Sequence, residues 1–443
     1  MEFMDDCRRD YGDTFTIRLL NIGTMVLFTK PEDIKQVFTG DTDSLRAGEA
    51  QADLAPLVGK HSVLVLDGAK HLRERRLMMP PFHGERMQAY ATLMREITDA
   101  SIDSWPLHEP FALHHYLQKL TLRVILKAIF GFEDGPRLDE FTAAVTRTVD
   151  AAMSPFVILP MFQMRLGGHS PWARFLEIEV HADKLLFAEI ARRRASADIE
   201  GRTDILSILL QARYEDGSPM TDQELRDELF TLIVAGHETS ATSLAWAFER
   251  LLTHPSAFAS ARAELERVVG NGPLEPEHLP RLEYIDAVLK ETLRLRPILP
   301  IVVRDVHSPV TIGGWTLPAG VRAAPCIYLA QRDPKSYPDA ETFSPERFLG
   351  ARIDPYSWLP FGGGVRRCLG MAFAQYEMKI VLAATLLRAR MHLADGGPAR
   401  VTRRAITLVP SGGTRVVLDG RAARRAKPAA AVTNVAVRPA DQN

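Results

Sequence analysis

Apolar side chains recur at helical spacing along much of the chain. Between Thr221 and Leu252 they lie three or four residues apart, which is the spacing of one helix face. Thr221 with Glu224 three residues later is typical of a capping box. Pro255 follows shortly after the last apolar position, where proline ends a helix. The pattern predicts a helix over Thr221–Leu252 that is long enough to cross a whole domain.

Strand-like runs are fewer and lie towards the two ends of the chain. Thr14–Leu20 and Met25–Thr29 are bounded by turn residues and predict a hairpin near the N-terminus. Thr311–Leu317 is another short run and carries two adjacent glycines. Ala405–Val409 and Thr414–Leu418 flank the turn sequence Pro-Ser-Gly-Gly and predict a second hairpin.

The sequence shows no internal repeat and no break in composition before about residue 420. We therefore expect one large domain over residues 1–420, mainly α with small β-sheets (an α+β fold). Residues 421–443 are rich in Ala, Arg, Val and Pro and contain almost no large apolar side chain. This composition predicts a disordered basic tail.

Charge and length exclude some classes of protein. The 443 residues include 54 Lys and Arg and 55 Asp and Glu, for a net charge of -1. This balance argues against nucleic-acid binding through bulk charge. The start of the chain lacks the features of a secretory signal, and no window supplies the roughly 18 apolar residues of a membrane helix. We expect a soluble, cytoplasmic protein without a membrane anchor.

Three cysteines, Cys7, Cys326 and Cys368, lie far apart, which excludes a paired-cysteine metal motif and a disulfide scaffold. Only Cys368 has a distinctive setting, because Phe361–Gly370 reads FGGGVRRCLG and an apolar helical pattern follows. Consecutive glycines let the backbone approach a flat ligand closely, and free N–H groups before a helix stabilise a thiolate. A thiolate held there is a soft ligand suited to iron or copper. The alternative is a small buried hydrophobe, which is the usual fate of a free cysteine.

The same segment resembles the haem-ligand signature of the cytochrome P450 family. The resemblance covers the chain from about Tyr11 to Leu418. It implies the P450 fold with its long central helix, haem b (iron protoporphyrin IX) as cofactor, and Cys368 as the iron ligand. The signature positions, all of them implied to bind the cofactor, are Phe361, Gly364, Arg366, Cys368 and Gly370.

Two further segments resemble the structural network of this family. Glu291 and Arg294 lie three apart in KETLRLRP and resemble the ExxR pair. Arg347, in Pro345–Phe348, resembles the arginine that joins that pair. Loss of one partner of a buried ion pair leaves an unpaired charge, so we assign these residues to folding and haem retention.

Ala235–Ser240, which reads AGHETS in the middle of the long helix, resembles the oxygen-activation motif of the family. A glycine inside a helix lowers stability by up to about 1 kcal/mol relative to alanine. The resemblance implies that this cost is offset by a groove at Ala235 and Gly236 in which oxygen binds. It also implies that Thr239 donates to bound oxygen and that Glu238 relays protons. The alternative for Thr239 is a bond to a helix carbonyl, and both can hold. His237 projects from a different face, so we reject it as a metal ligand.

His71–Arg75, which reads HLRER, occupies the place of the family's WxxxR motif, with histidine in place of tryptophan. A ring N–H donor is still available from histidine. The two haem propionates need cationic or N–H partners when they are buried. The resemblance assigns that role to His71, Arg75, Arg304 and Arg366.

The substrate pocket aligned by these landmarks is expected to have an apolar wall with one serine. An apolar wall predicts a lipophilic substrate. The pocket residues are Ser62, Val63, Leu64, Leu232, Ala235, Leu299, Ile301, Val302 and Ile406.

The resemblance implies a monooxygenase that inserts one oxygen atom from O2 into a lipophilic small molecule, by hydroxylation or epoxidation. The sequence has no flavin domain after the haem domain, so electrons from NAD(P)H would arrive through a ferredoxin or flavodoxin with its reductase. We expect the enzyme to act as a monomer and to dock an acidic partner through Arg73, Arg76 and Arg367. The alternatives are a peroxide-dependent P450, which would not need Glu238 and Thr239, and a non-catalytic haem-binding sensor or carrier.

Overall fold

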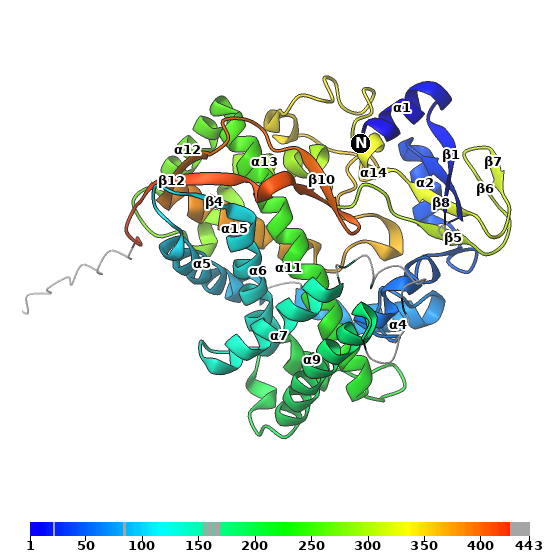
Figure 1. Cartoon of the computed structure of the whole chain (residues 1–443), viewed down its shortest axis with the longest axis horizontal. Helices are drawn as coiled ribbons and strands as arrows, with labels where there is room; N and C mark the ends of the chain where they lie inside the picture. Colours follow the sequence, from blue (N-terminus) through cyan, green and yellow to red (C-terminus); the bar gives the residue numbers. More distant parts are fainter. Residues whose placement is uncertain are drawn as a thin grey trace, which may run out of the picture.

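The computed structural model describes residues 1–20, 23–82, 86–152, 154, 157, 163 and 169–425. Helices form most of the described chain (Figure 1). The helices are α1 (Glu2–Tyr11), α2 (Pro31–Thr39), α3 (Ala55–Val58), α4 (Gly68–Met78), α5 (Arg86–Ser104), α6 (Leu113–Phe130), α7 (Pro136–Ala152), α9 (Pro171–Arg194), α10 (Ile205–Gln211), α11 (Asp222–Thr253), α12 (Pro255–Val269), α13 (Glu283–Leu295), α14 (Ile327–Ala330) and α15 (Met371–Arg388).

The strands form small sheets at the edges of this helical body. They are β1 (Thr14–Leu19), β2 (Gly23–Phe28), β3 (Leu45–Arg46), β4 (Pro110–Ala112), β5 (Arg304–Val306), β6 (Val310–Ile312), β7 (Trp315–Leu317), β8 (Arg322–Pro325), β9 (Ala389–Leu393), β10 (Val401–Arg404), β11 (Thr407–Pro410) and β12 (Arg415–Arg421). The largest sheet has the order β1-β2-β8-β5-β3. The mainly α fold with small sheets is therefore confirmed.

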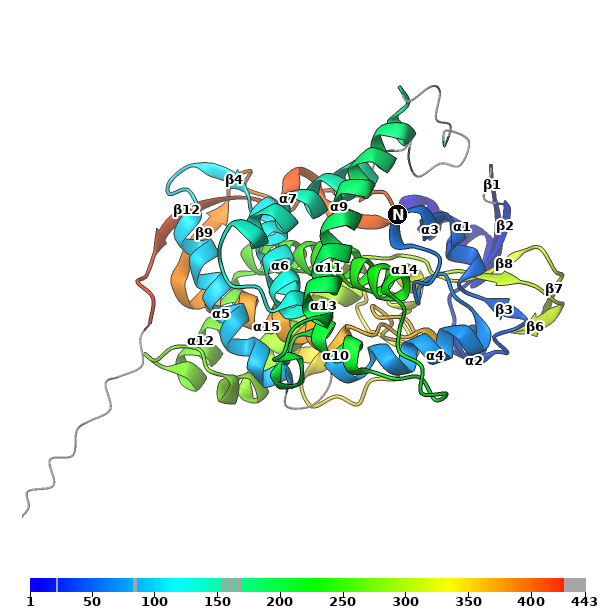
Figure 2. The same ribbon diagram turned by 90° about the horizontal axis from the view of Figure 1, so that it is seen from below.

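The predicted long helix is confirmed as α11, which crosses the middle of the molecule (Figures 1 and 2). The Thr221 hydroxyl accepts a hydrogen bond from the Glu224 backbone N–H, and the Glu224 carboxylate accepts one from the Thr221 backbone N–H. This capping box satisfies donors that the first helical turn leaves free. Helices α6, α9, α13 and α15 pack around α11, so most of its side chains are buried in the main hydrophobic core.

The N-terminal hairpin prediction is confirmed, because β1 and β2 pair antiparallel with Thr14 opposite Phe28. The second hairpin prediction is wrong. Strand β11 pairs with β10, and β12 pairs with β4 and β9 in a separate sheet. The turn at Ser411–Gly413 has Gly412 and Gly413 at positive φ, with Thr414 also at φ 52°. This turn carries the chain away from β11 into another sheet.

The predicted tail begins inside the last strand. Arg421 ends β12 and donates from Nη1 to the backbone oxygens of Ile102, Asp103 and Trp105, at 2.8, 2.7 and 3.0 Å. Arg424 Nε donates to Asp103 at 2.8 Å. The chain is thus held to the body up to residue 425, and the rest of the predicted tail, 426–443, lies outside the described residues.

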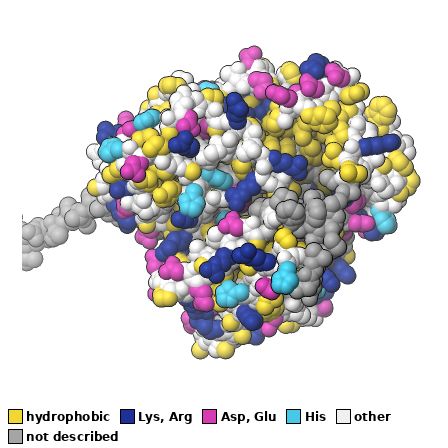
Figure 3. Space-filling view, viewed as in Figure 1, with side chains coloured by type: hydrophobic (Ala, Val, Ile, Leu, Met, Phe, Trp, Pro, Cys, Tyr) yellow, Lys and Arg dark blue, Asp and Glu magenta, His cyan; other side chains and the backbone are white. Residues whose placement is uncertain are grey.

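The face shown in Figure 3 mixes Lys and Arg side chains with Asp and Glu, in keeping with the balanced charge of the sequence. Among the described helices, none combines the length and the apolarity that crossing a membrane requires.

Candidate functional site

A tight loop places Cys368 immediately before α15. The Cys368 backbone N–H donates to the Phe361 carbonyl at 3.0 Å, and the Arg367 N–H donates to the Gly364 carbonyl at 3.1 Å. Gly364 has φ 62°, and a Cβ at this position would collide with the carbonyl oxygen of Phe38 in α2. Only glycine meets both conditions without strain, which gives this signature glycine a physical reason.

The Cys368 thiol lies deep in the protein and still has an open side. Burial raises the pKa of the thiol, whereas the Gly370 backbone N–H, Arg75 and Arg367 lower it. The residue is nevertheless exposed to solvent. Both observations hold together if the sulfur borders an internal cavity rather than the outer surface. The two other cysteines, Cys7 and Cys326, are buried.

The middle of α11 also borders open space. Ala235 is exposed, and Leu232, Gly236 and Thr239 are partly exposed. These positions lie on one helix face because they are three or four residues apart. An open face in the middle of an otherwise buried helix indicates an internal cavity. Within this face the Thr239 hydroxyl donates to the Ala235 carbonyl at 2.7 Å, which is the back-bonded alternative expected for a helical threonine.

Glu238 points to another side of α11 and is almost fully buried. Its Oε2 accepts from Gln118 Nε2 of α6 at 2.5 Å, and its Oε1 accepts from Arg404 Nη1 of β10 at 3.2 Å. His114 Nε2 lies 3.9 Å from the same Oε1. The structure therefore holds the Glu238 carboxylate away from the Thr239 hydroxyl. No local pattern in the sequence links Gln118 and Arg404 to Glu238, so they are identified as its partners only by the fold.

His237 takes no part in the open face. It is buried, and its Nδ1 lies 3.0 Å from the Ile233 carbonyl oxygen. Its own carbonyl accepts from the Thr121 hydroxyl of α6 at 2.8 Å. His237 thus serves the packing of α11 against α6.

Four predicted propionate partners, His71, Arg75, Arg304 and Arg366, lie close enough to influence one another, and we call them the cationic cluster. Burial, followed by Arg366 and Arg75, lowers the pKa of His71 to about 3. His71 is therefore a neutral N–H donor at neutral pH. Burial and then Arg366 lower the pKa of Arg304 to about 10. Burial also lowers the pKa of Arg75 and of Arg366.

The cationic cluster has too few negative partners. Arg366 donates to the Val63 carbonyl at 3.1 Å, to the Leu66 carbonyl and to the Asp67 carboxylate. Within the described residues, Arg304 donates only to the neighbouring Val303 carbonyl, at 2.8 Å, and the Arg75 side chain has no acceptor. One carboxylate thus faces three guanidinium groups in a buried region, where unpaired charge is costly. An anionic ligand would relieve this imbalance.

Asp67 is a site residue that the sequence analysis missed. It directly precedes α4, and its carboxylate accepts from the backbone N–H groups of Ala47, Gly48 and Glu49 at 3.0, 2.8 and 2.8 Å. Asp67 is thereby fixed before it meets Arg366. An aspartate directly before the first residue of a helix, here Gly68, is typical of an N-cap, and this pattern could have identified Asp67 from the sequence.

These features fit haem. Among the described residues, no three His, Cys, Asp or Glu side chains are grouped to hold a metal ion. A single cysteine ligand therefore requires a metal that arrives with most of its ligands, as iron does in a porphyrin. Cys368 would supply a thiolate ligand to the iron, the cationic cluster would hold the two propionates, and the open Ala235–Gly236 surface of α11 would leave room for the bound group.

Glu291, Arg294 and Arg347 meet in one buried network. Glu291 accepts from Arg294 Nε at 2.6 Å and from Nη2 at 2.8 Å, and Arg347 Nε donates to it at 3.1 Å. Arg294 also donates to the carbonyls of Gln331 and Ala340 at 2.9 and 2.7 Å. The network thus ties α13 to segments that precede the cysteine loop.

The predicted pocket residues differ in their exposure. Leu64, Leu232, Leu299, Val302 and Ile406 keep some exposure, as does Ala235. Ser62 is fully buried and its hydroxyl accepts from Thr231 at 2.7 Å. Val63 is buried, whereas Ile301 is also partly exposed and packs against the cluster under the N-terminal sheet.

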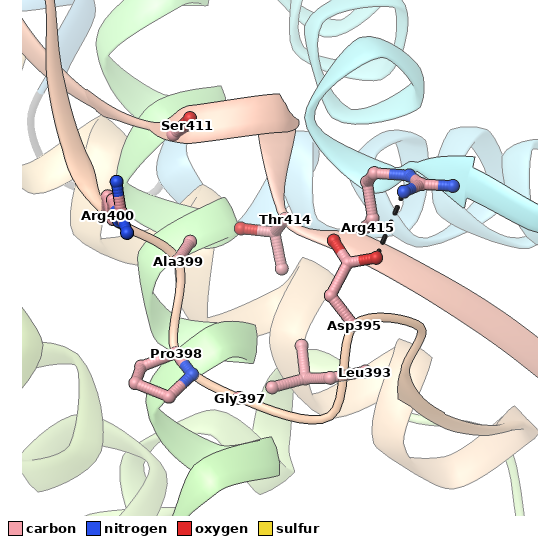
Figure 4. Close-up of a pocket in the computed structure, with 9 residues that line it drawn as sticks. All are labelled: Leu393, Asp395, Gly397, Pro398, Ala399, Arg400, Ser411, Thr414 and Arg415. Atoms are coloured by element: carbon pink, nitrogen blue, oxygen red, sulfur yellow. Dashed lines mark hydrogen bonds and ion pairs between the residues drawn. The ribbon is translucent and has the colours of Figure 1, made fainter.

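A separate cavity of about 170 Å³ lies at the base of the β10–β11 hairpin (Figure 4). Arg400 and Ser411 flank the hairpin there, and Asp395 pairs with Arg415 at 3.0 Å. None of the predicted site residues lines this cavity.

Comparison with known proteins agrees with the geometry. The family model described as Cytochrome P450 matches residues 1–416. The protein named cytochrome P450 135B1 of Mycobacterium tuberculosis is 40% identical over 416 residues, which cover 94% of this chain and 86% of that protein. Cytochrome P450 137 of the same species is 38% identical over 408 residues, covering 92% of this chain and 83% of that protein.

Solved structures share the fold. The retinoic acid bound cyanobacterial CYP120A1 has a TM-score of 0.82 at 24% identity, covering 95% of this chain and 94% of that one. The cytochrome P450DA heme domain has a TM-score of 0.84 at 22% identity, covering 95% of this chain and 93% of that one.

Proposed function

Because the chain belongs to the cytochrome P450 family of haem-dependent, oxygen-incorporating oxidoreductases, we propose that it oxidises a lipophilic small molecule by hydroxylation or epoxidation. The observation that carries this proposal is that the Cys368 thiol lies deep in the protein with one side open, close to the cationic cluster. That cluster has fewer negative than positive groups. A thiolate axial ligand favours oxygen activation over simple oxygen carriage.

Each group of residues has a proposed task. Haem, when bound, supplies the activation of O2 and the transfer of one oxygen atom to the substrate. The Gly370 N–H and the positive charge of Arg75 and Arg367 favour the thiolate of Cys368 but only partly offset burial, which raises the pKa of the thiol; coordination to a metal would complete the deprotonation. Thr239 Oγ1, once released from the Ala235 carbonyl, would hold a proton at the open face of α11. Glu238 would move a proton towards Thr239 after its carboxylate leaves Arg404 and Gln118.

The apolar lining supports the proposed substrate class. Leu64, Leu232, Leu299, Val302 and Ile406 carry no polar side-chain atom, and such walls select apolar ligands. A compound library screened by the spin-state shift of the haem spectrum tests this proposal. Fatty acids, terpenoids, steroids or polyketides should produce the shift. Shifts caused only by strongly charged, hydrophilic compounds would refute the substrate class.

The iron ligand can be tested separately from the substrate. Reduction under carbon monoxide should produce the strongly red-shifted Soret band of a thiolate-bound complex. Cys368→Ala should abolish this band, whereas the buried Cys326→Ala should keep it. A red-shifted band that survives in Cys368→Ala would overturn the assignment of the site.

A peroxide-dependent P450 is the second candidate, because the Glu238 carboxylate is bonded to Gln118 and Arg404 rather than to Thr239. With a substrate identified by the screen, Thr239→Ala should strongly reduce product formed from O2 and NADPH with surrogate partners. Turnover driven by hydrogen peroxide should change little. Activity with peroxide alone would favour the second candidate, and no turnover in either assay would favour a non-catalytic sensor or carrier.

We propose that electrons come from NAD(P)H through a separate ferredoxin or flavodoxin with its reductase, and that the enzyme is a cytoplasmic monomer. Arg73, Arg76 and Arg367 are exposed near the cysteine loop and α4. Arg73 lies 3.5 Å over the Tyr214 ring and Arg76 pairs with Glu215, so the loop after α10 helps to orient both.

Charge reversal tests this docking surface. Arg73→Glu with Arg76→Glu should slow the reduction of the haem at low salt, and the difference should shrink as salt screens the charges. Arg267→Glu is the matched control, because Arg267 is exposed on α12, which lies at the left of both views while α4 lies towards the right (Figures 1 and 2). Equal reduction rates in the double variant and the control would refute the docking surface.

A further inference from the structure

The β10–β11 hairpin has an unusual tip. Arg404 and Thr407 are the last paired residues, so Ala405 and Ile406 form the turn. Ala405 adopts φ 52°, a left-handed conformation that residues other than glycine seldom adopt. The turn is braced by Arg403 Nε, which donates to the Ala405 carbonyl at 2.6 Å, and by the Thr407 hydroxyl, which donates to the Arg404 carbonyl at 2.8 Å. These bonds fix the position from which the Arg404 side chain extends.

Arg404 joins three elements that are far apart in the sequence. Its Nη1 donates to Glu238 Oε1 of α11 at 3.2 Å, and its Nη2 donates to Asp150 Oδ1 of α7 at 3.3 Å. The Glu238 side chain is 10% exposed, whereas that of Arg404 is 32% exposed. A partly exposed cation can leave a nearly buried carboxylate more easily than a buried one can. The bond between Arg404 and Glu238 is therefore suited to break and form again.

The same hairpin borders the predicted ligand wall. The Leu408 N–H donates to the Ile298 carbonyl at 2.9 Å, and Trp246 Nε1 of α11 donates to the Leu408 carbonyl at 3.1 Å. Strand β11 thus runs between α11 and the segment that leads to Leu299. Ile406 remains 51% exposed at the tip. At the other end, the cavity of about 170 Å³ beside Arg400 leaves space at the base of the hairpin (Figure 4).

We propose that Arg404 is a positioning residue for Glu238, and that it couples ligand occupancy at Ile406 to the orientation of the Glu238 carboxylate. An apolar ligand large enough to contact Ile406 displaces the hairpin tip and draws Arg404 away from Glu238. The carboxylate is then released on the Oε1 side and can turn towards Thr239. This inference rests on the proposed function, since it assumes that Glu238 relays protons.

The contact itself can be tested without any turnover. Arg404→Ala, Glu238→Ala and the double variant form a cycle, measured as shifts of the urea denaturation midpoint of the haem-loaded protein. The two single shifts should add up to more than the shift of the double variant, because both remove one shared bond. Arg403→Ala is the matched control, since the one hydrogen bond of its side chain within the described part of the chain goes to the Ala405 carbonyl, and its cycle with Glu238→Ala should be additive. Additive shifts in the Arg404 cycle would overturn the proposal.

The link to the ligand is tested with two probes that bind haem iron through a nitrogen atom. Clotrimazole is bulky and apolar, and imidazole is too small to reach the hairpin. If a bulky ligand must break the bond between Arg404 and Glu238, loss of that bond favours its binding by the same coupling factor. Arg404→Ala should bind clotrimazole about tenfold more tightly than the wild type, within the usual range of such couplings. Its affinity for imidazole should not change.

Two results would overturn the link. One is an equal change of affinity for both probes, and the other is a clotrimazole gain that persists in Ile406→Ala combined with Arg404→Ala. Failure of the proposed function looks different, because wild-type protein would then form no product from O2 with surrogate partners, whereas the azole-induced shifts could still be measured. In that case the denaturation cycle still decides whether Arg404 holds Glu238.

Discussion

Substitution of Glu291 by alanine should destabilise the protein more than any surface change on the same helix. Glu291 accepts from Arg294 Nε and Nη2 at 2.6 and 2.8 Å, from the Ser344 N–H at 2.9 Å and from Arg347 Nε at 3.1 Å. Both Glu291 and Arg294 are fully buried, so water cannot replace the lost carboxylate. Breaking a buried pair in this way costs about 3–5 kcal/mol. That is a large part of the roughly 5–15 kcal/mol that holds a typical domain folded.

Urea denaturation of the haem-loaded protein, followed by tryptophan fluorescence, gives the difference in the free energy of unfolding. Lys290→Ala is the matched control on α13, because Lys290 forms a partly exposed pair with Asp286 at 2.7 Å. Loss of such a pair costs about 0.3–0.5 kcal/mol. If Glu291→Ala lost no more stability than Lys290→Ala, the network would not be the structural lock described above. Replacement of both buried partners by apolar residues should recover part of the loss, since no charge is then left unpaired.

Three further variants test the cysteine loop, a buried acid and the cationic cluster. Gly362→Ala and Gly364→Ala both place alanine at positive φ, at a cost of about 1–2 kcal/mol. Only Gly364→Ala also collides with the Phe38 carbonyl, so it should lose haem more readily on mild heating. Equal loss of haem from the two variants would contradict this difference. Burial raises the pKa of Glu377 to about 8 from an ordinary 4.5, so the folded state keeps a proton that the unfolded state releases across that window. Stability should therefore fall as pH rises from 4.5 to about 8, by at most about 1.4 kcal/mol per pH unit. Glu377→Gln should flatten the plot of denaturation midpoint against pH. An unchanged slope in that plot would exclude this titration. Arg304→Met should speed haem transfer to apomyoglobin but leave the haem-free protein equally or more stable, because an unpaired buried charge is removed. Arg304→Lys should retain haem better than Arg304→Met. Loss of stability in Arg304→Met without faster haem transfer would make Arg304 purely structural.

Local patterns predicted the elements whose signals are local. The capping residues and the apolar spacing of Thr221–Leu252 predicted α11 to within one residue at either end. The turn signals around Thr14–Leu20 predicted both strands of the N-terminal hairpin. In each case the partner of the pattern lies a few residues away in the chain, so the sequence alone contains the interaction.

Pairing between distant segments was not predictable in the same way. Strand runs before and after Pro-Ser-Gly-Gly were recognised, but their partners were not, because β10, β4 and β9 are chosen by tertiary packing. Gly412 and Gly413 at positive φ permit a change of sheet as readily as a tight hairpin. A glycine-rich turn therefore predicts a reversal of the chain without predicting which strand receives it.

The polar partners of the site show the same limit most clearly at Glu238. Its motif predicted a proton relay beside Thr239, and both residues lie on the central helix as expected. Consecutive residues on a helix project about 100° apart, so Glu238 faces α6 and β10 while Thr239 faces the open side. A relay between them therefore requires the Glu238 side chain to leave its present partners. The motif indicates the chemistry, but the contacts with Gln118 and Arg404 determine when that chemistry can take place.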